Sequence, residues 1–211
     1  MTDKTSGEQY FTTNPNADHH FQQFDFELLD HQLHFTTDSG VFSKSTVDFG
    51  TRTMLDALSK TTIPTGKILD LGTGYGPVGI SIAKAYNRKV DMVDVNERAL
   101  ALAKQNAQKN GVGNLTRIFQ SDVYQNIDQQ YAAILVNPPI RAGKQVVTAM
   151  LQEAIKYLQP GGKLIAVLQK KQGAPSAQKN MLLAFGNASV IHKNKGYYTL
   201  ESTHGERSNI Q

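Results

Sequence analysis

From residue 67 onward, short apolar runs alternate with longer stretches that carry the spacing of amphipathic helices. A chain in which strands alternate with helices builds a mostly parallel sheet whose two faces are covered by helices. The sequence therefore predicts an α/β fold. The expected strands are residues 67–71, 90–94, 115–120, 132–136, 164–168, 189–192 and 197–201. The expected helices are a stretch ending near residue 85, then 97–110, 144–158 and 177–185.

The sequence before residue 67 predicts a two-stranded hairpin followed by a helix. Residues 24–29 alternate apolar and acidic side chains, as a half-buried strand does, and residues 33–36 are the expected partner across a turn at 30–32. A helix is expected over about 50–58. We therefore divide the chain into an N-terminal extension, residues 1–60, and a main domain, residues 61–211.

Composition excludes several classes of protein. The chain has no cysteine, which rules out disulfides, thiolate metal sites and a cysteine nucleophile. Its six histidines show no metal-ligand spacing, so no metal is expected. No run of about 18 apolar residues occurs, and the first residues lack an apolar signal core. We therefore expect a cytoplasmic protein that does not enter a membrane.

Charge is unevenly distributed. Residues 1–60 carry 4 basic and 9 acidic side chains, whereas residues 141–211 carry 10 and 3. A basic C-terminal third suits a polyanionic partner such as RNA. Scattered lysines also keep an ordinary surface soluble, so charge alone leaves both interpretations open.

The first expected core strand runs into a glycine-rich turn. Gly72, Gly74 and Gly76 allow a tight turn and the close approach of a ligand. The glycine spacing also satisfies the weak dinucleotide pattern G-x-G-x-x-G. Asp70, at the end of the strand, argues against a dinucleotide, because its carboxylate would repel a pyrophosphate. The same carboxylate would attract the ammonium and sulfonium of S-adenosylmethionine.

Two further acids follow expected strands. Asp94 lies 20 residues after Gly74, where a carboxylate can accept hydrogen bonds from both ribose hydroxyls. Asp122 follows the next strand and is a candidate acceptor for an adenine amino group. The alternative is that these acids are helix caps or turn formers, which are common at strand-to-helix junctions.

A strand at 132–136 leads into Asn137-Pro138-Pro139-Ile140. Two prolines stiffen the backbone just past the strand end, where open α/β sheets place their sites. The Asn137 side-chain oxygen and the Pro138 carbonyl are both acceptors, so each can take one hydrogen of a planar NH2 group. That arrangement aims the nitrogen lone pair at a sulfonium methyl. The alternative is a simple Asn-Pro turn.

Together, the glycine turn with Asp70, the acid at Asp94 and the Asn137-Pro138-Pro139 sequence resemble class I S-adenosylmethionine-dependent methyltransferases that act on planar amino groups. Residues 39–43 and 47–51 more narrowly resemble the small-domain enzymes typified by ribosomal small-subunit RNA guanine-N2 methyltransferases. This resemblance implies a seven-stranded Rossmann-like sheet with an antiparallel last strand. It also implies that Phe42 and Ser43 belong to a loop that closes over the cofactor.

The chain departs from this family in two respects. The position after the two prolines is often aromatic in the family and stacks on the target base, whereas Ile140 offers only apolar contact. A stacking ring must then come from elsewhere, with Phe42, Tyr197 and Tyr198 as candidates. Two-domain members also carry an additional N-terminal domain, and this chain has one copy of the motifs.

Four basic residues lie near the expected cofactor rim and are candidate RNA contacts: Arg141, Lys144, Lys170 and Lys171. The leading hypothesis is methylation of guanine N2 in small-subunit (16S) ribosomal RNA. The alternatives are a release-factor-type protein glutamine N5-methyltransferase, a catalytically silent RNA-binding module and an NAD-dependent oxidoreductase. The glutamine enzymes usually have an aromatic after the two prolines and a helical N-terminal domain, and this chain shows neither. The sequence leaves the oligomeric state open.

Overall fold

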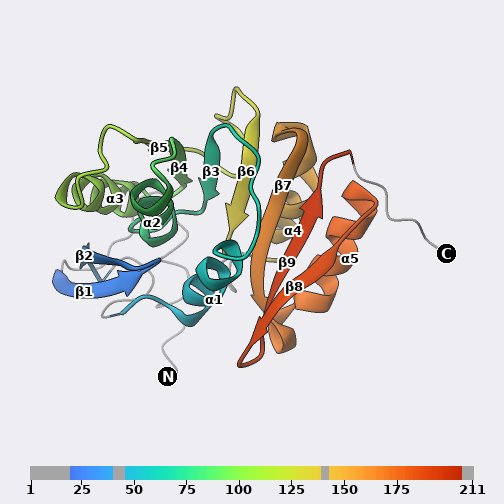
Figure 1. Cartoon of the computed structure of the whole chain (residues 1–211), viewed down its shortest axis with the longest axis horizontal. Helices are drawn as coiled ribbons and strands as arrows, with labels where there is room; N and C mark the ends of the chain where they lie inside the picture. The colour runs from blue at the N-terminus through green and yellow to red at the C-terminus, as the bar shows by residue number, and fades with distance from the viewer. Residues whose placement is uncertain (1–19, 40–45, 139–142, 206–211) are drawn as a thin grey trace, which may run out of the picture.

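The computed structural model describes residues 20–39, 46–138 and 143–205 (Figure 1). Five residues singled out above lie outside the described residues: Phe42, Ser43, Pro139, Ile140 and Arg141. Most predicted elements are present within one to three residues of their expected ends, and the exceptions are described below.

The centre of the molecule is a seven-stranded sheet with the order β5-β4-β3-β6-β7-β9-β8. The neighbouring pairs from β5 to β7 are parallel, whereas β9 is antiparallel to both β7 and β8. The predicted mostly parallel sheet with an antiparallel last strand is therefore confirmed. The strands are β3 (Ile68–Leu71), β4 (Val90–Asp94), β5 (Thr116–Gln120), β6 (Tyr131–Val136), β7 (Leu158–Gln169), β8 (Ser189–Asn194) and β9 (Tyr197–Thr203).

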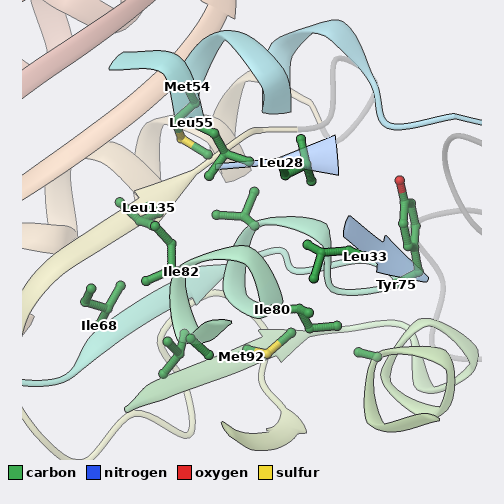
Figure 2. Packing of buried hydrophobic residues seen from close by; sticks show 14 of the residues in the cluster. Leu28, Leu33, Met54, Leu55, Ile68, Tyr75, Ile80, Ile82, Met92 and Leu135 are labelled. Carbon is green, nitrogen blue, oxygen red and sulfur yellow. The ribbon is translucent and has the colours of Figure 1, made fainter. Parts of the chain in front are cut away.

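Helices cover both faces of this sheet because consecutive strand residues point to opposite sides. In β3, Ile68 joins a core with Met54, Ile82 and Ala103, on the face covered by α1, α2 and α3 (Figure 2). Leu69 faces the other core, under α4 and α5. The helices are α1 (Phe49–Leu58), α2 (Pro77–Tyr86), α3 (Glu97–Lys109), α4 (Lys144–Gln152) and α5 (Ala174–Phe185).

The N-terminal hairpin forms its own two-stranded sheet from β1 (Gln22–Leu28) and β2 (His31–Thr37). Its turn is Leu29–Asp30, with φ of 50° and 61°, so the expected turn at 30–32 was wrong. A two-residue turn with positive φ at both positions matches the right-handed twist of the strands. The side chains of Asn106 and Asn110, on α3, bond the backbone of Thr36 and His34, and so hold the outer edge of β2.

The helix expected over 144–158 was also wrong in its second half. α4 ends at Gln152, a 3-10 helix covers Glu153–Tyr157, and β7 begins at Leu158. The Pro160-Gly161-Gly162 sequence is therefore an irregularity inside a strand rather than the end of a helix. The backbone of Gly161 and Gly162 bonds that of His204, which keeps this stretch attached to the end of β9.

Candidate active site

A cavity of about 1180 Å³ lies at the carboxyl ends of β3, β4 and β6. Strand β3 sits between β4 and β6, so the chain leaves the middle of the sheet in two directions here, which is where open α/β sheets place their ligands. The cavity brings together most of the predicted site residues that the structure describes. These are Asp70, Gly72, Gly74, Asp94, Asp122, Asn137, Pro138 and Lys144.

The glycine turn adopts a conformation that other residues rarely take. Gly72, Gly74 and Gly76 have φ of 80°, 57° and 98°. A Cβ on Gly74 would meet nothing within 4 Å, so glycine is favoured there by the backbone angle and not by lack of space. At Gly76 a Cβ would come within 2.9 Å of the Ile80 and Met92 side chains, so glycine also provides room for the packing beneath the turn.

Asp70 is almost completely buried at the floor of the cavity, 3% exposed. Its Oδ2 accepts the Thr73 hydroxyl at 2.6 Å and the Gly79 N–H at 2.9 Å. Burial raises the pKa of this carboxyl from 3.8 to about 6, the two hydrogen bonds oppose that rise, and the charge of Asp94 adds to it. Oδ1 accepts no hydrogen bond within the described segments, so a cationic ligand group would find an unneutralised acceptor.

Asp94 connects the end of β4 to the glycine turn. One oxygen accepts the Gly74 N–H at 2.9 Å, and the other accepts the Asn96 N–H at 3.0 Å. Burial raises the pKa of this carboxyl, and the backbone N–H donors lower it. Because each carboxylate oxygen has a second lone pair, Asp94 can hold the turn and still accept a hydroxyl group.

The loop after β5 contains a residue that the sequence did not single out. Val123 lines the cavity beside the exposed Asp122 and has φ of 48°, a strained angle for a β-branched side chain. The Ser121 hydroxyl donates to the Val123 carbonyl at 2.9 Å, and the Gln125 N–H donates to the Asp122 carbonyl at 2.9 Å. These bonds fix the loop that presents Asp122 to the cavity.

The amide of Asn137 is held from a distant part of the chain. Its Nδ2 donates to Asp48 Oδ1 and to Thr51 Oγ1, both at 3.1 Å. Asp48 is also the N-cap of α1, where the same oxygen accepts the Thr51 N–H at 3.0 Å. A carboxylate only accepts, so the amide must turn its NH2 toward Asp48. Its carbonyl oxygen then remains as an acceptor, with no partner among the residues that are described.

Gly50 leaves room for this arrangement. A Cβ at this position would lie 3.0 Å from Asp48 Oδ1, 3.2 Å from Asn137 Oδ1 and 3.2 Å from Tyr197 Cε1. The ring of Tyr197 therefore lies close to the Asn137 amide, on the wall of the cavity. Gln169 donates to the Tyr197 hydroxyl at 2.6 Å, and the ring of Phe49 packs 5.4 Å away.

Of the three candidate stacking rings, only Tyr197 lies on the described cavity wall. Tyr198 follows it on β9, points to the opposite side of the sheet and packs against the core under α4 and α5. Lys144 lines the cavity, whereas Lys170 and Lys171 are exposed on the adjoining 3-10 helix, Lys170–Gln172, outside the lining. The sequence also missed a polar wall supplied by Thr148, Gln172, Ser176 and Asn180.

Neither a metal centre nor a membrane span is found in residues 20–39, 46–138 and 143–205. No three or more histidine, aspartate or glutamate side chains there are grouped so that they could hold a metal ion. No helix of that portion is long and apolar enough to cross a bilayer.

Comparison with known proteins adds independent information. The sequence profile of the family described as "Methyltransferase small domain" matches residues 32–201. The Bacillus subtilis (strain 168) "Uncharacterized protein YbxB" is 45% identical over 198 residues, which cover 92% of this chain and 98% of that protein. "Ribosomal RNA small subunit methyltransferase C" of Vibrio vulnificus (strain CMCP6) is 30% identical over 189 residues, which cover 86% of this chain and 53% of that protein.

Among solved structures, "T. Thermophilus 16S rRNA N2 G1207 methyltransferase (RsmC) in complex with AdoMet and Guanosine" is similar with a TM-score of 0.78 and 23% identity. The match covers 87% of this chain and 50% of that one. At this identity the similarity establishes the fold. The chain spans about half the length of the Vibrio and Thermus proteins and nearly all of YbxB.

Proposed function

The chain belongs to the methyltransferase small domain family, and from this premise we propose that it methylates N2 of a guanine in small-subunit (16S) ribosomal RNA. Its cofactor is S-adenosylmethionine. The observation that carries the proposal is the Asn137 amide, whose NH2 is bound by Asp48 and Thr51 and whose oxygen remains free to accept. Such a substrate would place the protein in the cytoplasm.

The residues at the glycine turn fit this cofactor. Asp70 provides a buried negative charge for a cationic group, and Asp94 provides oxygens for ribose hydroxyls. Asp122, on the loop after β5, provides an acceptor for the adenine amino group. When bound, S-adenosylmethionine supplies an electrophilic methyl group on a positively charged sulfur. The residues Asp70, Asp94 and Asp122 hold and orient it there.

Asn137 and Pro138 act on the acceptor. The Asn137 Oδ1 and the Pro138 carbonyl each accept one hydrogen of the guanine NH2, which directs the nitrogen lone pair toward the methyl group. The amino nitrogen gains positive charge as it is methylated and then releases a proton to solvent, so no strong base is required. Positioning and the two oxygen dipoles provide most of the rate acceleration.

Tyr197 takes the place of the aromatic that is missing at position 140. Its ring lies beside the Asn137 amide, and the hydrogen bond from Gln169 holds it in position. A flipped base is commonly held between aromatic or apolar side chains. We assign Tyr197 to one face of the guanine, with Lys144 at the cavity mouth as a phosphate contact.

The relatives support RNA rather than protein as the substrate. The Vibrio protein is named for the small-subunit ribosomal RNA, and the Thermus structure is described with AdoMet and guanosine. The alternative, a glutamine N5-methyltransferase, would use the same amide acceptors on a protein side chain.

The test is transfer of labelled methyl from S-adenosylmethionine to three acceptors: deproteinised small-subunit RNA lacking the modification, isolated small subunits and release-factor protein. Label in an RNA-containing sample, at N2 of a guanine and lost in Asn137→Ala, is expected. Label on protein alone would replace the proposal with the glutamine reaction. Binding of S-adenosylmethionine without any transfer would favour a silent RNA-binding module.

A further inference from the structure

A long segment of the chain carries lysines but no acidic side chain. Residues 154–200 contain seven lysines and no aspartate or glutamate. Lys156 and Lys163 pair with Glu153 and Glu201, which lie just outside this segment. The other five lysines, 170, 171, 179, 193 and 195, form no ion pair among the residues that the structure describes.

Four of these five lysines lie on two segments whose backbones are joined by a hydrogen bond. The Lys170 N–H donates to the Gly196 carbonyl at 2.8 Å, which joins the 3-10 helix after β7 to the tight turn between β8 and β9. Lys170 and Lys171 are exposed on the 3-10 helix, Lys195 is exposed in the turn, and Lys193 is exposed near the end of β8. We call these four side chains the hairpin lysine cluster.

Aromatic rings connect the hairpin lysine cluster to the cavity. The Lys195 Nζ lies 5.5 Å from the centre of the Phe49 ring, and Phe49 packs 5.4 Å from Tyr197, which lines the cavity. Lys193 lies on the other side of the hairpin, with its Nζ 5.0 Å from the Tyr198 ring. The positive charges therefore begin at Phe49, one ring away from Tyr197, and extend around the end of the hairpin.

The geometry points to the hairpin lysine cluster as the surface that binds the phosphates of single-stranded RNA flanking the methylated base. The rings of Phe49, Tyr197 and Tyr198 are half-buried. Ammonium groups without an acidic partner beside partly accessible aromatic rings are a common surface for a single nucleic acid strand, because the charges neutralise phosphates while rings stack on bases. This inference rests on the proposed function, since it assumes an RNA substrate whose target base reaches Tyr197. The alternative is that the same lysines bind an acidic protein, and the test below distinguishes the two partners.

The test compares two variants that each remove three positive charges. One is Lys170→Gln/Lys171→Gln/Lys195→Gln. The matched control is Lys89→Gln/Lys104→Gln/Lys109→Gln, whose lysines are exposed on the α2–α3 side of the molecule. The dissociation constant of a labelled, deproteinised small-subunit RNA fragment is measured over a series of salt concentrations, without cofactor. The slope of log affinity against log salt counts the phosphate contacts, at about 0.7 per contact for single strands.

For Lys170→Gln/Lys171→Gln/Lys195→Gln, the hairpin variant, we expect a salt slope smaller by about 2 and an affinity for RNA about tenfold lower at physiological salt. The control should bind like the wild-type protein, and both variants should keep their affinity for S-adenosylmethionine. Equal slopes in the two variants would overturn the inference, as would a hairpin variant that loses affinity for an acidic protein such as release factor instead of RNA. The single substitution Lys171→Glu gives a second test, in which the affinity for RNA and the salt slope should also decrease.

This binding assay separates the inference from the proposed function. Asn137→Ala should show the same salt slope of RNA binding as the wild-type protein, because Asn137 acts on the base rather than on phosphates. If RNA binding depends on the hairpin lysine cluster but no guanine is methylated, the inference about the RNA-binding surface is supported and the proposed reaction is wrong. If guanine is methylated and both triple variants bind alike, the reaction stands and the surface is elsewhere.

Discussion

The cavity has a cofactor half, at Asp70, Asp94 and Asp122, and an acceptor half, at Asn137 and Tyr197, and the two are built in different ways. In the cofactor half, Asp70 and Asp94 are held by partners 3, 9 and 20 residues away, all within one strand-turn-helix-strand unit. In the acceptor half, Asn137 is held by partners 86 and 89 residues away, and its neighbouring ring comes from Tyr197 at the other end of the chain. A site built from one continuous segment leaves a readable sequence pattern, whereas one assembled from three segments does not.

The halves also differ in charge. Carboxylates dominate the cofactor half, with Asp70, Asp94 and Asp122 along one wall. The acceptor half holds one carboxylate, Asp48, which binds the neutral Asn137 amide. Lys144 also lines the cavity, and Lys170 and Lys171 lie on the adjoining 3-10 helix. In the proposed reaction, a cationic cofactor and a polyanionic substrate are thereby drawn to different sides of one cavity. The following substitutions separate the two halves, beginning with the largest expected effect.

Asn137→Ala should abolish the function of the acceptor half alone. We expect methyl transfer to fall at least about 100-fold, because the amino group loses its positioning acceptor. The dissociation constant of S-adenosylmethionine, measured by calorimetry, should stay within about threefold of wild type. A similar loss of cofactor affinity would mean that the two halves are not independent.

Asp70→Asn should affect the cofactor half. The amide oxygen can still accept from Thr73 and Gly79, but the negative charge is gone, so we expect S-adenosylmethionine affinity to fall about 10- to 100-fold. In the wild-type protein Asp70 ionises above about pH 6, so affinity should decrease as the pH falls below 6. This decrease should be smaller in Asp70→Asn, where the buried Asp94, whose pKa is also raised, is left to titrate.

The same substitution has an opposite consequence for stability. The Asp70 pKa is raised from 3.8 to about 6 on folding, so the cofactor-free fold is favoured at low pH and loses that contribution as the pH rises through 6. Asp70→Asn should therefore unfold at a higher denaturant concentration than wild type at pH 8. Equal midpoints at pH 8 would show that burial of this carboxylate costs little.

Asp48→Ser tests the distant support of Asn137. Serine still caps α1, so stability should change by no more than about 1 kcal/mol, but its shorter side chain cannot reach the amide. We expect the turnover number to fall about tenfold with the KM for cofactor unchanged, because the acceptor oxygen is no longer fixed. Asp48→Asn, which keeps a carbonyl oxygen at the same place, should restore most of the activity. Failure of that rescue would assign Asp48 a role beyond positioning.

Tyr197→Leu should give the smallest change in activity. Loss of one stacking ring corresponds to about 1 kcal/mol, so we expect the KM for RNA to rise about fivefold. Tyr197→Phe keeps the ring but loses the hydrogen bond from Gln169, so its KM should lie between those of the wild type and Tyr197→Leu. Tyr198→Leu controls for weakening of the hairpin, since Tyr198 faces the other side of the sheet, and it should raise the KM less than Tyr197→Leu does. An equal effect from both leucine variants would indicate general weakening of the hairpin.

Prediction of the fold failed only where local signals were ambiguous. The Pro160-Gly161-Gly162 sequence suggested the end of a helix, yet its backbone is kept in the sheet by bonds to His204, which the sequence does not reveal. The hairpin turn was displaced because polar residues at 30–32 suggested a longer loop, whereas Leu29 takes a left-handed angle that leucine rarely adopts. In both places, pairing with another strand overrode the preference of the residues themselves.

By itself, the sequence determined the parallel sheet and the glycine turn, and it indicated the two acids that follow the turn and Asn137-Pro138 as candidate site residues. Each of these depends on residues within about 20 positions of one another or on the simple alternation of strands and helices. Only the tertiary structure decided which way the Asn137 amide faces, which of two adjacent tyrosines reaches the cavity and which lysines gather at its rim. Those features depend on side chains that folding brings together from α1, β6 and β9, and no local pattern records such an encounter.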